Sequence, residues 1–111
     1  MARKVVITGL GATTPIGGDV PTLWANSLKG VSGAATLTDE WVEEYQLPVT
    51  FAARASNPAS ETLSRVEMKR MDPSTQFAVV ASREAWKDSG LEEVDPDRLS
   101  VTFATGIGGV W

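Results

Sequence analysis

The 111-residue sequence contains no cysteine and no histidine. The missing cysteines exclude disulfide bonds and thiolate nucleophiles. The missing histidines exclude imidazole metal ligands and every catalytic triad that uses His as its base. No apolar run reaches membrane-spanning length, and the N-terminal MARKVVITGLG lacks the apolar stretch of a signal peptide. We therefore expect a cytoplasmic protein that is not inserted in a membrane and has no metal site.

Positive charge is also scarce, since the 10 Lys and Arg residues are outnumbered by 14 Asp and Glu residues, which gives a net charge of −4. No global basic field is present to attract phosphates, which argues against a nucleic-acid-binding protein. Apolar residues make up 42% of the chain and charged residues 22%, as in globular proteins. The length is sufficient for one domain with a modest core.

Two segments carry clear helix signals. Asp19 and Pro21 predict the start of a helix over about 20–29, and Asp72 with Pro73 predicts one over about 73–89. Apolar residues cover most of the circumference of the second helix, so we expect it to be largely buried. Shorter helical segments are expected at 61–71 and within 39–44.

Two tryptophans, Trp24 and Trp86, stand at helical core spacing on the two clear helices. Their spacing predicts that both side chains lie in the core.

Short β-branched runs predict buried strands over residues 4–8 and 99–105, with a weaker strand over 49–55. Strands that alternate with helices indicate an α/β layered fold. A buried strand and a largely apolar helix need more packing partners than these residues supply. We therefore expect the chain to be the front part of a larger protein, the alternative being a small self-contained domain.

The first strand leads into a glycine-rich loop, within the stretch VVITGLGATTPIGGD. Gly9 and Gly11 match the first two glycines of the dinucleotide fingerprint, but the third position is Thr14, followed by Pro15, which has no N–H to offer a phosphate. No lysine follows Gly17 or Gly18, so the phosphate loop of nucleotide hydrolases is absent as well. The glycines are better explained by tight turns and close packing.

Three stretches in order are VVITGLGATTPIGGD, RVEMKRMDPSTQFAVVASREAWKDSGL and ATGIGG. Together they resemble the β-ketoacyl-acyl-carrier-protein synthases, elongating type II condensing enzymes of the thiolase-like superfamily. The resemblance covers essentially the whole chain. It implies that residues 1–111 form the N-terminal, incomplete part of a β-ketoacyl synthase domain with a thiolase-like layered αβαβα fold.

The resemblance also implies an activity, an acyltransferase of fatty acid or polyketide biosynthesis. Such an enzyme takes an acyl group from acyl carrier protein onto a cysteine, decarboxylates malonyl carrier protein with the help of two histidines, and joins the two by Claisen condensation. No dissociable cofactor is implied. The partners are acyl carrier protein, acyl and malonyl thioesters, and a second copy in a homodimer.

The sequence lacks the catalytic residues of the family. The family's cysteine and histidines lie further along the chain than residue 111, and none is present here. We expect this chain alone to be inactive, with no catalytic residue of its own. Two alternatives stay open: a non-condensing relative similar to a chain-length factor, and an independent module that docks carrier protein.

The resemblance assigns a docking role to the basic residues Arg65, Lys69 and Arg70, which precede the Met71-Asp72 pair. A basic patch on an otherwise acidic protein would attract the acidic carrier protein. The alternative is a solvated helix face whose charge is balanced by Glu61 and Glu67.

The resemblance also assigns Ile107 and Gly108, in the sequence TGIGG, to the acyl pocket. There the isoleucine would limit chain length by its bulk, and the glycines would supply backbone freedom. The alternative is that Ile107 packs in a core and the glycines only form a turn.

Overall fold

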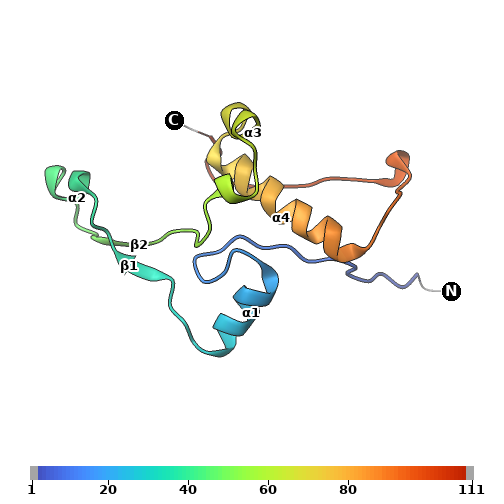
Figure 1. Cartoon of the computed structure of the whole chain (residues 1–111), viewed down its shortest axis with the longest axis horizontal. Coiled ribbons are helices and arrows are strands. Elements are labelled where there is room, and N and C mark those ends of the chain that lie inside the picture. The colour runs from blue at the N-terminus through green and yellow to red at the C-terminus, as the bar shows by residue number, and fades with distance from the viewer. Residues whose placement is uncertain (1–2, 110–111) are drawn as a thin grey trace.

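The computed structural model describes residues 3–109 and contains both helices and strands (Figure 1). Two of its helical segments, η1 and η2, are single 3₁₀ turns. In chain order, the elements are α1 (Val20–Leu28), β1 (Ala34–Thr36), α2 (Glu40–Glu44), β2 (Phe51–Ala53), η1 (Ala59–Glu61), α3 (Arg65–Arg70), α4 (Pro73–Ser89) and η2 (Pro96–Arg98).

The two clear helices begin where their capping residues predict. The Asp19 carboxylate accepts the Thr22 N–H at 2.7 Å, and the Asp72 carboxylate accepts the Thr75 N–H at 3.0 Å. Each cap satisfies a backbone donor that the first turn leaves free. Helix α4 ends at Gly90, which takes the left-handed conformation with φ of +64°. The predicted bounds of α1 and α4 are therefore confirmed to within one residue.

The helix predicted over 61–71 forms only over Arg65–Arg70, and residue 61 belongs instead to the preceding 3₁₀ turn η1. Ser64 accepts the Glu67 N–H while the Glu67 side chain accepts the Ser64 N–H, so the two residues form a capping box. This box starts α3 at Arg65, separate from the 3₁₀ turn η1. Sequence periodicity does not register such a restart, because the apolar spacing continues across it.

A hairpin arm extends from the body of the molecule (Figure 1). Strands β1 and β2 pair antiparallel with Ala34 opposite Ala53 and Thr36 opposite Phe51. Helix α2 lies at the tip of the arm. The predicted strand over 49–55 is thus confirmed over its centre, whereas its partner β1 has no apolar alternation that could have predicted it.

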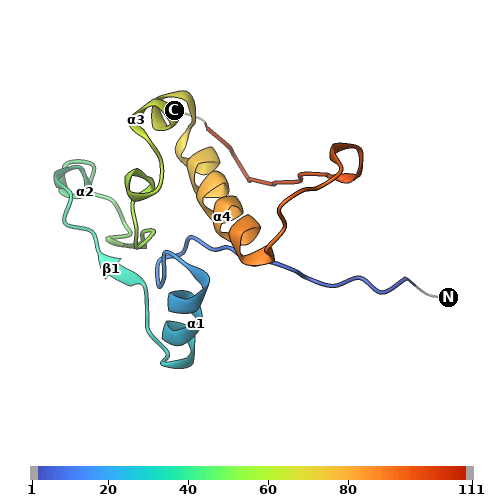
Figure 2. The same ribbon diagram turned by 45° about the vertical axis from the view of Figure 1, so that its right-hand side comes forward.

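The strands predicted over 4–8 and 99–105 are not formed. Both segments are extended but have no strand partner among residues 3–109, and the side chains of Val5 and Val101 are 93% and 74% exposed. A strand is stable only when a neighbouring strand satisfies its backbone groups. Residues 99–105 run along α4, whereas residues 4–8 extend beyond the C-terminal end of that helix, and the two segments do not pair with each other (Figures 1 and 2).

The predicted core positions are also wrong. Trp24 and Trp86 are 65% and 44% exposed, and no residue of α4 is fully buried. Among the described residues, the only buried apolar side chains are Val42 and Leu63. The radius of gyration is 17.4 Å, against about 13 Å for a compact domain of this length. The apolar faces are therefore present but are not covered by residues 3–109.

Within the described part of the chain, no helix combines the length and apolar character needed to cross a bilayer. Over the same residues, no three acidic side chains gather into a group that could hold a metal ion.

Candidate functional site

The glycine-rich loop packs directly on the backbone of α4 (Figure 2). A Cβ atom added to Gly9 would lie 2.1 Å from the carbonyl oxygen of Ala85, and one added to Gly11 would lie 1.9 Å from that of Ala81. Ala81 and Ala85 are one helical turn apart, so they present small side chains along one stripe. Only glycine permits this approach.

Backbone donors of the loop are bound by carboxylates of α4. The Leu10 N–H donates to Asp88 Oδ2 at 2.9 Å, and the Ala12 N–H donates to Glu84 Oε2 at 2.8 Å. The other oxygen of Glu84 accepts the Val20 N–H at 2.8 Å, in the first turn of α1. The positions where a phosphate-binding loop would hold its ligand are filled from within the chain, which supports the structural explanation of the glycines.

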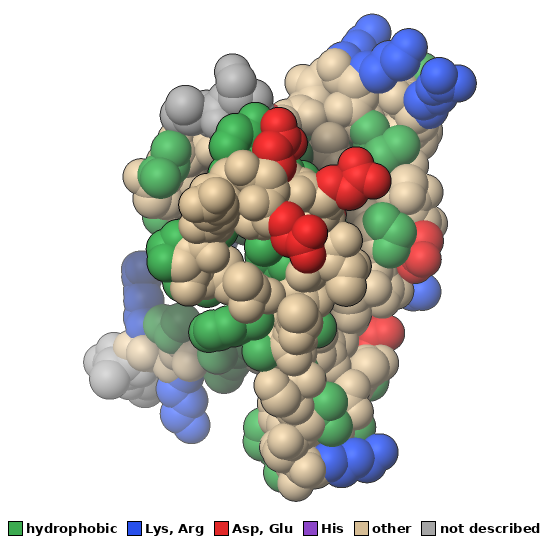
Figure 3. Space-filling model, turned by 90° about the vertical axis from the view of Figure 1, so that its left-hand side faces the viewer, with side chains coloured by type: hydrophobic (Ala, Val, Ile, Leu, Met, Phe, Trp, Pro, Cys, Tyr) green, Lys and Arg blue, Asp and Glu red, His purple; other side chains and the backbone are tan. Residues whose placement is uncertain are grey.

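The basic residues Arg65, Lys69 and Arg70 all lie on α3 and are exposed. Basic side chains gather at the end of the molecule formed by α3 (Figure 3). Over residues 3–109, the ion pairs are Arg54–Asp39 and Arg83–Glu67, so none of the three basic residues is paired within the described structure.

The acidic residues expected to balance this patch are engaged elsewhere. Glu67 accepts hydrogen bonds from Ser64 and Arg83, and Glu61 accepts one from Asn57 at 3.0 Å. The Ser64 hydroxyl and backbone N–H, followed by Arg83, lower the pKa of Glu67 to about 2. At neutral pH, Glu67 is therefore ionised, and its carboxylate binds Ser64 and Arg83 rather than the basic residues of α3.

The loop that contains Ile107 and Gly108 lies at the same end of the molecule as α3 (Figure 2). Gly108 has φ of +73°, and its N–H donates to Thr105 Oγ1 at 3.1 Å. A Cβ atom on the next residue, Gly109, would lie 2.7 Å from Cβ of Asp72, the residue that caps α4. The 105–109 loop therefore lies next to Asp72, which joins α3 to α4 and stands two residues after Arg70.

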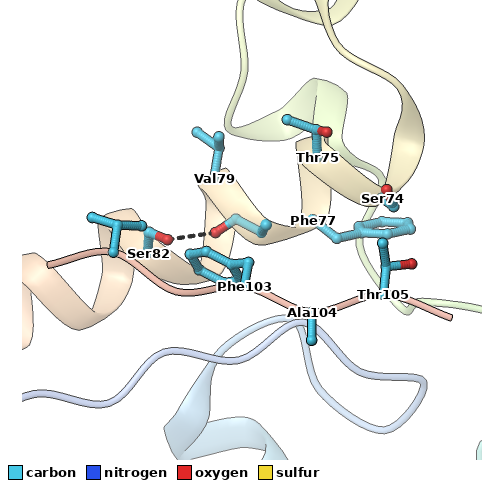
Figure 4. A pocket seen from close by; sticks show the side chains of 10 residues that line it. Ser74, Thr75, Phe77, Val79, Ser82, Phe103, Ala104 and Thr105 are labelled. Carbon is cyan, nitrogen blue, oxygen red and sulfur yellow. Dashed lines mark hydrogen bonds between the residues drawn. The ribbon is translucent and has the colours of Figure 1, made fainter. Parts of the chain in front are cut away.

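The Ile107 side chain is 81% exposed in the described structure. A groove of 540 Å³, whose lining does not include Ile107, lies between α4 and the extended segment that precedes the loop (Figure 4). Its lining is mostly apolar: Ser74, Thr75, Phe77, Ala78, Val79, Ser82, Val101, Phe103, Ala104 and Thr105. The Ser82 hydroxyl points to α4 itself and donates to the Ala78 carbonyl at 2.7 Å.

Sequence reasoning missed the residues of α4 that hold the other segments, namely Gln76, Arg83, Glu84 and Asp88. In the sequence they are only four of the several polar positions of the helix. Such positions are ordinarily interpreted as a solvated face.

Comparison with known proteins identifies the family of this chain. The model of the family described as "Beta-ketoacyl synthase, N-terminal domain" matches residues 2–110.

Curated relatives match over nearly the whole chain. The 3-oxoacyl-acyl-carrier-protein synthase 2 of Staphylococcus aureus strain COL is 43% identical over 110 residues, which are 97% of this chain and 26% of the relative. The protein of the same name from Mycobacterium bovis is 38% identical over 104 residues, or 94% of this chain and 25% of the relative. The chain therefore spans about a quarter of the length of these relatives.

Proposed function

Because the chain belongs to the β-ketoacyl synthase family, as the N-terminal domain, we propose that it is part of a β-ketoacyl-acyl-carrier-protein synthase. The reaction is the decarboxylating Claisen condensation, in which malonyl carrier protein loses carbon dioxide and its remaining two carbons extend the acyl chain. The observation that carries this proposal is the 43% identity over 97% of the chain to a 3-oxoacyl-acyl-carrier-protein synthase.

The catalytic groups belong to a part of the protein outside these residues. The 111 residues hold no Cys and no His, and they match about a quarter of the synthases. The extended segments 4–8 and 99–105 run in the same direction as each other and pair with no strand of the described residues, as would two strands of a parallel sheet whose neighbouring strands belong to the rest of the protein (Figure 1). We propose that the remaining chain completes this sheet and buries α4 within the layered αβαβα fold of the thiolase-like superfamily.

The contribution of residues 1–111 is the docking of acyl carrier protein. Arg65, Lys69 and Arg70 are exposed, lie on one short helix and have no ion-pair partner in the described structure. An unpaired basic patch speeds the encounter with an acidic protein. The independent docking module is a weaker explanation, because two buried side chains do not make a core for a separate domain.

The function is tested on the intact protein. Its denatured mass is measured first, and we expect a value several-fold above the 11.8 kDa of these residues. The protein is then given an acyl carrier-protein thioester and malonyl carrier protein, and we expect carbon dioxide release together with a 3-oxoacyl product. A protein that docks carrier protein but forms no 3-oxoacyl product would be a relative similar to a chain-length factor.

Ile107 is proposed to limit the length of the acyl chain. Its replacement by phenylalanine adds bulk, so we expect the intact enzyme to accept shorter acyl chains than the wild type does. The measurement is kcat/KM for a series of acyl carrier-protein substrates. An unchanged chain-length profile would mean that Ile107 does not line the acyl pocket, to which Gly108 is also proposed to belong.

The assembly is proposed to be a homodimer in the cytoplasm. Sedimentation of the intact protein as a monomer at micromolar concentration would contradict the dimer.

A further inference from the structure

One side chain of α4, that of Gln76, holds the C-terminal end of α3. The Gln76 amide Nε2 donates to the carbonyl of Met71 at 2.9 Å and to that of Met68 at 3.2 Å. Gln76 is half-buried, so these carbonyls gain a partner where water has limited access. Arg70 lies between the two anchored carbonyls, and Lys69 directly precedes it.

Arg83 of α4 holds the first turn of the same helix. Its guanidinium donates to Glu67 Oε1 at 2.5 Å, while Glu67 Oε2 accepts the Ser64 N–H at 2.9 Å and the Ser64 hydroxyl at 2.7 Å. The arginine is thus bound to the capping box rather than to an isolated carboxylate. Its charge is compensated by Glu67, which distinguishes it from the three basic residues of α3.

Gln76 and Arg83 are seven residues apart, which corresponds to two turns of α4 and places them on one stripe. Helix α3 has only six residues, and a helix of this length is not stable by itself in water, so it depends on contacts with other segments. Its direction is therefore set by what holds its two ends. Both anchors come from α4, and both leave Arg65, Lys69 and Arg70 exposed.

We propose that Gln76 and Arg83 are positioning residues for carrier-protein docking, which hold α3 so that its three basic side chains present one surface. The proposal rests on the proposed function, because it requires that α3 is the docking helix. Neither residue is proposed to contact the carrier protein. Arg83 in particular acts through Glu67, although its charge alone would suggest direct docking.

The test uses the intact synthase with Gln76→Ala and Arg83→Met, and with Arg98→Met as the matched control. Arg98 is also exposed but lies in η2, away from α3. Loss of one anchor is expected to raise KM for the carrier-bound acyl substrate about tenfold, the effect of a charge-assisted or half-buried hydrogen bond. The kcat, the KM for a carrier-free acyl thioester and the values for Arg98→Met are expected to stay unchanged.

Glu67→Gln separates positioning from direct contact. Glutamine retains the capping box but loses the charged pair with Arg83. If Arg83 positions α3, Glu67→Gln weakens docking as much as Arg83→Met does, and the double variant is no weaker than either single one. If Arg83 instead binds the carrier directly, Glu67→Gln leaves docking intact or strengthens it, and the proposal is wrong.

Two further outcomes would overturn the inference, each for a different reason. If reversal of Lys69 and Arg70 weakens docking but Gln76→Ala and Arg83→Met do not, the docking surface stands and the positioning role fails. If none of these variants changes docking, the proposed docking surface itself fails. An equal rise of KM for carrier-free and carrier-bound substrates would indicate general structural damage rather than positioning.

Discussion

Replacement of Gly11 by alanine is expected to destabilise the intact protein by about 3 kcal/mol or more, the upper part of the range for forced overpacking. The new Cβ would lie 1.9 Å from the Ala81 carbonyl oxygen and 2.8 Å from the Ala85 nitrogen. Both are backbone atoms of α4 and cannot rotate away. The loop must therefore leave the helix, which also separates the Ala12 N–H from Glu84. The measurement is the free energy of unfolding in urea.

Gly106→Ala provides the matched control for this prediction. A Cβ atom at Gly106 meets nothing within 4 Å, and its φ lies outside the left-handed region. We expect a change within about 0.5 kcal/mol for an open surface site. Equal losses for the two variants would mean that the contact between the glycine loop and α4 does not stabilise the protein.

Simultaneous replacement of Lys69 and Arg70 by glutamate is expected to weaken binding of acyl carrier protein about 100-fold, because two attractive charges become repulsive toward an acidic partner. Both residues are exposed on α3, and neither is paired in the described structure, so the reversal disrupts no intramolecular ion pair. The measurement is the dissociation constant for carrier protein at several salt concentrations. The difference from wild type is expected to shrink as salt screens the charges.

The control for this reversal is the double replacement of Lys29 and Lys87 by glutamate, which changes the net charge by the same amount. Lys29 caps α1, and Lys87 lies in the last turn of α4, so both are exposed but outside α3. A loss as large as that of the α3 variant would show that carrier protein responds to the overall charge rather than to a docking helix.

The helix bounds were predictable because their signals are local. Asp19 and Asp72 each bond a backbone N–H three residues away, and Gly90 ends α4 by its own φ. Such interactions span one turn, and the residue types that make them are few. The restart of α3 at Ser64 is equally local, but it was missed because the apolar spacing runs through it.

The strands and the core were not predictable to the same degree. The β-branched run at 5–7 favours an extended backbone, and the backbone is extended, but no described segment pairs with it. Trp24 and Trp86 have core spacing and remain largely exposed. Propensity sets the local conformation, whereas pairing and burial depend on a second surface.

The candidate docking surface shows the same difference between what local sequence and what tertiary contacts determine. The sequence showed that Arg65, Lys69 and Arg70 belong together, but it offered Glu61 and Glu67 as their balance. Only the structure shows that Glu67 is bound to Ser64 and Arg83, so that within residues 3–109 the three basic residues have no ion-pair partner.

The sequence by itself determined the helix bounds, the absence of Cys and His from these 111 residues, and the family pattern, since each is a matter of residue type and short spacing. Tertiary structure decided that the glycine loop lies on α4 and that Glu84 and Asp88 bind its N–H groups. It also decided that Gln76 and Arg83 hold the two ends of α3. The loop contacts join residues more than 70 positions apart. Hydrophobic periodicity carries no information about them, because it records which face is apolar and not what will cover it.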